Sequence, residues 1–214
     1  MKQYKALSIV LMSLFAFNVI AEDNAAAIEL SVIEAEERQQ IIKELSFRLN
    51  LKKNCNQTLD WRDSGSGADL DGFFFLPNLE ENEYMIGGHA SQKRRSKFHC
   101  VITVTVPAGN PKQSPAPLLK PKDWQRVWID KGSGAAKDGA FWQAISPSDD
   151  YRCLGHVSQL THKQKPQLNN YRCVHKLLTN KLTTKSIVWS DIGSGADKPV
   201  TVFRLPVTDA YVAV

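Results

Sequence analysis

The sequence predicts an all-β domain of three repeated antiparallel β-meanders, arranged as a pseudo-threefold, β-prism-like body, with one N-terminal helix. Three observations lead to this prediction. The motif W-x-D-x-G-S-G-A occurs three times. From residue 47 onward, short β-rich runs alternate with turn residues, which is typical of an all-β domain. Residues 25–47, by contrast, contain no glycine or proline and are rich in helix-forming residues.

The motif copies begin 67 and then 61 residues apart. Such self-similarity indicates one supersecondary unit used three times, because a single unit cannot bury its own apolar face. The predicted repeats cover about 58–123, 124–185 and 186–214. The repeated motif residues are Trp61, Asp63, Gly65, Gly67, Trp128, Asp130, Gly132, Gly134, Trp189, Asp191, Gly193 and Gly195.

The copies also match downstream of the motif. Asp71 and Asp138 follow the motif aspartate by eight residues, and Tyr84, Tyr151 and Tyr211 follow a shared aromatic position at nearly equal spacing. These tyrosines are therefore predicted to be equivalent.

The third copy is short and needs another strand to complete its sheet. Residues 47–52 alternate apolar and polar side chains, as a half-buried strand does. We expect this segment to complete the third sheet, which gives a β domain of residues 47–214.

The motif has a structural interpretation and two functional ones. Tryptophan would fill the core, Gly-Ser-Gly would supply a turn with positive φ, and aspartate would cap the N–H groups of that turn. Alternatively, calcium could bind between Asp63 and Asp71, or between Asp130 and Asp138, through oxygen ligands. A sugar held by aspartate, backbone amides and a neighbouring aromatic ring is the other functional interpretation.

The N-terminus has the layout of a signal peptide. Lys2 and Lys5 precede an apolar stretch from Ala6 to Ile20, and Ala21 follows it at the expected cleavage point. We expect residues 1–21 to be removed near Ala21, leaving a secreted or periplasmic protein. Residues 22–46 then form an acidic helix, which packs on the body or presents a surface to a protein partner.

Charge is unevenly distributed along the chain after the predicted signal peptide. Residues 22–45 carry seven acidic and two basic side chains, whereas the chain from residue 46 onward carries 15 acidic and 23 basic ones. A basic body favours an anionic partner, either a lipid or a glycan, although solvated turns often have the same composition. The candidate contact residues, from two loops of the predicted repeats, are Lys93, Arg94, Arg95, Lys97, Lys163 and Lys165.

Four cysteines in an exported chain favour two disulfides. Three pairings are possible. Because Cys153 and Cys173 lie in strands that are expected to form a hairpin, Cys153–Cys173 is the preferred bridge, which leaves Cys55–Cys100.

Enzymatic chemistry fits poorly. The motif serine is not in a G-x-S-x-G nucleophile elbow, and the five histidines lack a recognised metal-ligand spacing. An active site also needs one asymmetric constellation, whereas these residues recur in each copy. We expect no cofactor unless calcium binds at the motif, and no nucleic-acid partner, because no aromatic-basic recognition pattern is present.

The triple motif, the downstream aspartate and aromatic positions and the Tyr-x-x-(Leu/Ile)-Gly element resemble the vacuolar protein sorting 62 family over about residues 61–214. The resemblance implies a β-prism of three sheets. It also implies relatedness to other β-prism domains. Those of eukaryotes bind acidic phospholipid membranes, and some of those in bacteria accompany pore-forming proteins.

The predicted function is an exported, non-catalytic binding module that recognises an anionic membrane surface or a glycan. A secreted toxin or effector component, acting on membranes or with a partner protein, is an alternative. A periplasmic protein that binds and neutralises another protein is a second alternative.

Overall fold

A computed structural model describes residues 29–92, 100–107, 114–182 and 186–214. The chain divides into two compact units, residues 1–44 and 45–214. A helix covers residues 29–47. The predicted signal peptide and the first residues of the predicted helix lie outside the described residues. Among the described helices, none is long and apolar enough to cross a bilayer.

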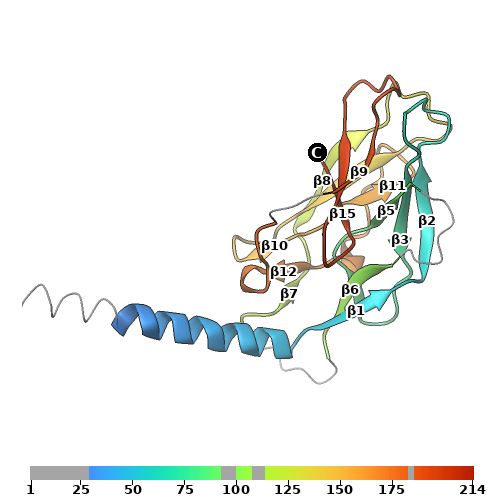
Figure 1. The fold of residues 1–214 in the computed structure, drawn as a ribbon. Helices are drawn as coiled ribbons and strands as arrows, with labels where there is room; N and C mark the ends of the chain where they lie inside the picture. Colours follow the sequence, from blue (N-terminus) through green and yellow to red (C-terminus); the bar gives the residue numbers. More distant parts are fainter. Residues whose placement is uncertain (1–28, 93–99, 108–113, 183–185) are drawn as a thin grey trace, which may run out of the picture. The chain divides into compact units, whose positions relative to one another are not determined.

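The second unit is all-β, as predicted, and consists of five small antiparallel sheets in a prism-like arrangement of repeated meanders (Figure 1). Each motif copy lies in its own three-stranded sheet. The first sheet is β2 (Gln57–Arg62), β3 (Phe73–Pro77) and β5 (His89–Ser91). The second is β8 (Asp123–Ile129), β9 (Ala140–Ile145) and β11 (Val157–Gln159). The third is β13 (Ser186–Ser190), β14 (Thr201–Arg204) and β15 (Tyr211–Ala213).

The three sheets share a local irregularity. In each, the register of the first strand pair shifts immediately before the motif tryptophan. A β-bulge at this position bends the strand and re-aims the side chain that follows it. The same bend therefore places each tryptophan.

The other two sheets are formed by the strands that do not belong to the motif sheets. One contains β1 (Asn50–Asn54), β6 (Val101–Thr105) and β4 (Glu83–Met85). The other contains β7 (Leu118–Leu119), β12 (Cys173–His175) and β10 (Tyr151–Arg152). Two 3₁₀ turns, Leu168–Asn170 and Lys176–Leu178, flank β12.

Both disulfides staple a strand pair in these smaller sheets. Cys55 and Cys100 continue the β1–β6 pairing, and Cys153 and Cys173 continue the β10–β12 pairing. This is the pairing that the sequence favoured. The two central strands, β6 and β12, occupy corresponding places, yet their bridges run to neighbours on opposite sides. Disulfides are typical of an oxidising, extracytoplasmic environment.

The motif tryptophans contact one another in the core. Their ring centroids are 5.7 Å apart for Trp61 and Trp128, 5.9 Å for Trp61 and Trp189, and 5.8 Å for Trp128 and Trp189. Each is 5% exposed or less. Phe74 and Phe141 pack against this cluster. Aromatic side chains bury large areas, so these five residues form the main apolar contact between the three copies.

Two predictions about the third copy are wrong. Residues 47–52 do not complete its sheet, because β1 pairs with β6 and β15 supplies the third strand. Tyr211 is not equivalent to Tyr84 and Tyr151, which lie in β4 and β10, because β15 corresponds to β5 and β11. The third copy passes from β14 to β15 without an intervening strand, through a turn with positive φ at Val207 and Asp209.

Candidate functional site

The motif tryptophans link the three copies in a cycle. Each indole Nε1–H donates to the backbone carbonyl that lies seven residues after the aspartate of another copy. The three bonds are Trp61 to Lys137 (3.0 Å), Trp128 to Lys198 (2.8 Å) and Trp189 to Leu70 (2.9 Å). The first copy thus donates to the second, the second to the third and the third to the first. Buried indole N–H groups usually have such a partner.

A second cycle runs through the backbones of the motif loops. In each loop, the N–H six residues after the aspartate donates to a carbonyl of another loop. The three bonds are Ala136 to Ser64 (2.9 Å), Asp197 to Lys131 (2.8 Å) and Asp69 to Ile192 (2.9 Å). We call this set of three interlinked loops, residues 63–72, 130–139 and 191–200, the motif ring.

Glycines occupy close approaches between the copies, although the third copy has Val200 at the position of Gly72 and Gly139. The Gly-Ser-Gly glycines all have positive φ, between 73° and 88°. Downstream, a Cβ on Gly139 would lie 2.2 Å from a ring atom of Trp61, and one on Gly72 would lie 2.8 Å from Trp189. These positions have no room for a side chain. The motif therefore has the structural role of joining the copies.

The motif aspartates do not all use their carboxylates in the same way. Oδ1 of Asp63 accepts from the Gly72 N–H (2.8 Å), and Oδ1 of Asp191 accepts from the Val200 N–H (2.9 Å). Asp63 also accepts from Nε1 of Trp189 through Oδ2 (2.6 Å). Burial raises the pKa of Asp63, although these hydrogen bonds oppose that shift. Asp63 and Asp191 therefore cap their own loops.

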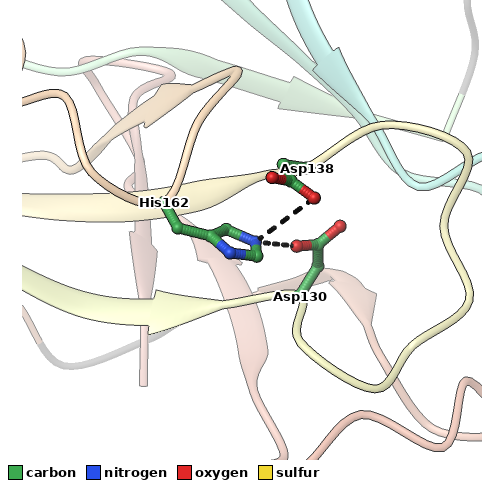
Figure 2. Close-up of side chains that lie close together, drawn as sticks. All are labelled: Asp130, Asp138 and His162. Carbon is green, nitrogen blue, oxygen red and sulfur yellow. Dashed lines mark hydrogen bonds and ion pairs between the residues drawn. The ribbon is translucent and has the colours of Figure 1, made fainter.

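Asp130 has a different partner. Its Oδ1 contacts Nε2 of His162, which lies in the segment after β11. Oδ1 of Asp138 lies 4.0 Å from the same nitrogen. Figure 2 shows both carboxylates directed toward the imidazole from the two ends of one motif loop. The structure thus brings together Asp130 and Asp138, as the calcium interpretation requires, and adds a histidine that the sequence did not indicate.

A cleft lies at each junction between copies. The first cleft, of about 230 Å³, has Asp60 and Arg62 on one side and Lys137 on the other. The third, of about 340 Å³, lies between Gln92 and Arg204 of the first and third copies. One such cleft lies at each junction, but the three linings differ in charge.

The second cleft is the most basic of the three. It has a volume of about 310 Å³ and is lined by Arg126, Lys131 and Lys198, with Asp197 as the acidic residue. Lys131 and Asp197 form an exposed ion pair of 2.9 Å. The guanidinium of Arg126 donates to the carbonyl of His162. Three cations and one carboxylate leave an excess of two positive charges, which suits an anionic group.

The candidate contact residues of the sequence are only partly described. Lys93, Arg94, Arg95 and Lys97 lie outside the described residues. Lys165 forms a 2.7 Å ion pair with Asp123, so its charge is locally balanced. Lys163 is exposed in the same segment as His162.

Sequence reasoning missed the basic residues of the second cleft. Arg126 stands two residues before the motif tryptophan, where the other copies have Leu59 and Ile187. Lys131 follows the motif aspartate, where the other copies have Ser64 and Ile192. These basic residues could have been found as positions where the second copy differs from the other two. A repeat, however, is recognised from the positions at which its copies agree.

Comparison with known proteins agrees with the fold and with the family that the sequence resembles. The model of the Vps62 family, "Vacuolar protein sorting-associated protein 62", matches residues 49–210. The chain belongs to this family. Membership confirms the resemblance that the motif indicated. The matched range includes both the motif ring and the three clefts. No curated protein matches the chain.

The crystal structure of GNIP1Aa from Chromobacterium piscinae is similar to this Vps62-family chain. The TM-score is 0.67 and the sequence identity is 31%, over 78% of this chain and 33% of GNIP1Aa. The chain thus spans about a third of the length of GNIP1Aa. The same fold therefore occurs as one part of a longer protein.

Proposed function

We propose that the protein is an exported, non-catalytic binding module that recognises anionic groups on a membrane surface or a glycan. The observation that supports this most is the second cleft, where Arg126, Lys131 and Lys198 line one hollow with a single carboxylate. Clustered cations attract anionic headgroups by about 1 kcal/mol each near a lipid surface. The two disulfides agree with export into an oxidising compartment.

The absence of a catalytic role is part of the proposal. The motif residues that recur in all copies serve to join them, through the tryptophan and backbone cycles. What distinguishes one copy from another is the charge at its cleft. That pattern fits a module that presents surfaces of different charge on one scaffold.

Vesicle co-sedimentation tests the lipid form of the proposal. The purified protein is mixed with neutral or anionic vesicles at low and at physiological salt. We expect binding to anionic vesicles only, and weaker binding at higher salt because exposed charges are screened. Replacing Arg126, Lys131 and Lys198 together with alanine should weaken binding by about 100-fold, on the basis of about 1 kcal/mol per cation.

The matched control removes the same charge elsewhere. Lys53, Lys120 and Lys122 are exposed and do not line the clefts. If their triple alanine variant loses as much binding as the cleft variant, net charge rather than the cleft is responsible. If neither vesicle type binds, the lipid form is wrong. Binding to an acidic glycan that free sugar competes away would then support the glycan form.

A component of a larger assembly is the second candidate function. The chain corresponds to a third of GNIP1Aa, and the helix exposes Leu30 (61%) and Val32 (49%). Under this proposal, which includes a secreted toxin or effector component, the helix holds a protein partner. Deleting residues 22–44, which leaves the buried Leu45 in place, should then abolish complex formation while leaving the β domain folded, as judged by its circular dichroism spectrum.

A further inference from the structure

We propose that Asp130, Asp138 and His162 form a binding site for a divalent transition-metal ion. This site is separate from the proposed recognition of anions. Its candidate ligand atoms, the two carboxylate oxygens and Nε2 of the imidazole, all lie within 4.8 Å of one another. They come from two segments that are far apart in the sequence, the second motif loop and the segment after β11 (Figure 2).

The other motif copies indicate that this arrangement is more than a loop cap. In copies one and three, Oδ1 of the motif aspartate accepts from the backbone N–H nine residues later. In copy two, Oδ1 of Asp130 contacts Nε2 of His162 instead. The carboxylate has thus exchanged a fixed backbone donor for a side chain that can ligate a metal.

The burial of the three groups is that of an open site. The side chain of Asp130 is 5% exposed, that of His162 is 23% exposed and that of Asp138 is 71% exposed. Metal–ligand distances of about 2.0–2.2 Å place ligand atoms up to about 4 Å apart. The 4.0 Å between Asp138 and His162 is close to this range, and Asp138 lies on the open side. Water would supply the remaining ligands.

The donor set selects the class of metal. Calcium and magnesium prefer oxygen ligands alone, whereas an imidazole nitrogen suits zinc, copper, iron and nickel. One imidazole with two carboxylates therefore favours a first-row transition metal over calcium. Zn²⁺ should bind more tightly than Mn²⁺, following the general affinity order of these ions. A bound ion would tie the segment around His162 to the motif ring.

Calorimetric titration of the metal-free full chain, without an affinity tag, tests the site. We expect one Zn²⁺ per chain, weaker binding of Mn²⁺ and the weakest binding of Ca²⁺. Loss of groups that only support a metal ligand typically costs 10–100-fold in affinity, so loss of a ligand itself should cost at least about tenfold. Asp138→Asn and His162→Gln should each show this loss. Co²⁺ should give visible absorption bands with the unaltered chain but not with His162→Gln.

Asp71→Asn is the matched control, because Asp71 holds the position of Asp138 in the first copy and is also exposed. It should leave Zn²⁺ affinity unchanged. The proposal is overturned if no stoichiometric binding occurs, or if Asp138→Asn and His162→Gln bind Zn²⁺ as the unaltered chain does. Should His162→Gln fail to fold, Asp138→Asn decides alone, because its side chain is mostly in solvent.

Discussion

The first and second motif copies use the same aspartate in different ways. Asp63 is enclosed by its own loop and by the indole of Trp189. Asp130 instead meets His162, beside a cleft lined by Arg126 and Lys131. The shared residues hold the copies together, whereas the residues that differ between copies create the charged surface. Candidate function is therefore found where one copy departs from the others.

Removing a shared core residue should have the largest effect. Trp189→Ala deletes one of three mutually packed indoles and the hydrogen bond to Leu70. We expect a loss of about 3–5 kcal/mol in the free energy of unfolding, as for other buried Trp→Ala changes. Urea denaturation measures it. Trp189→Phe, which retains a ring but no donor, should lose less; an equal loss would show that packing contributes little.

The next largest change in stability is expected at a pair of acidic residues outside the motif. Glu83 and Asp150 each precede a matching tyrosine, yet Glu83 is buried and Asp150 is exposed. Burial would raise the pKa of Glu83, but hydrogen bonds from Thr103, the Glu80 N–H, Asn54 and Lys52 outweigh it and lower the pKa to about 2. The carboxylate thus stabilises the fold above its unfolded pKa of 4.5, and this contribution is lost as the pH falls toward 2.

Glu83→Gln should therefore cost about 3 kcal/mol at pH 7, and the difference from the unaltered protein should vanish near pH 2. Asp150→Asn, which removes one partner of a surface ion pair with Lys176, should change stability little at any pH. Denaturation curves across this pH range give both values. A cost of Glu83→Gln that does not change with pH would show that lost packing, rather than charge, is responsible.

Replacing the motif aspartates Asp63 and Asp130 should give the smallest changes in stability, but it compares the two copies most directly. Asp63→Ala leaves the Gly72 N–H without its acceptor and removes one of two acceptors of the Trp189 indole. A buried donor left unsatisfied costs about 1–3 kcal/mol, so we expect a loss of about 2 kcal/mol. Asp130→Ala, measured by the same urea denaturation in metal-free buffer, should lose about 1 kcal/mol, the value of an ordinary hydrogen bond. Equal losses would contradict the distinction between the two copies.

The sequence predicted what the copies share. The W-x-D-x-G-S-G-A motif predicted the loops, the tryptophan core and the three sheets, because residues that recur in every copy have the same structural role in each. It failed for Tyr211, whose spacing imitates that of Tyr84 although the third copy has no strand equivalent to β4. His162 was missed because it lies 32 residues from Asp130, and the antiparallel pairing of β11 with β9 brings the segment after β11 back toward the second motif loop.

The cyclic order of the tryptophan hydrogen bonds has a consequence for the origin of the domain. A donor on one copy and an acceptor on the next form a head-to-tail joint that closes after three units, which is the geometry of a cyclic trimer. The three copies of this single polypeptide are thus arranged as the subunits of a cyclic trimer are. In a trimer of identical subunits, a change in one is a change in all. Covalent fusion removes that restriction, so Arg126 can stand in the second copy while Leu59 and Ile187 keep the matching places in the others.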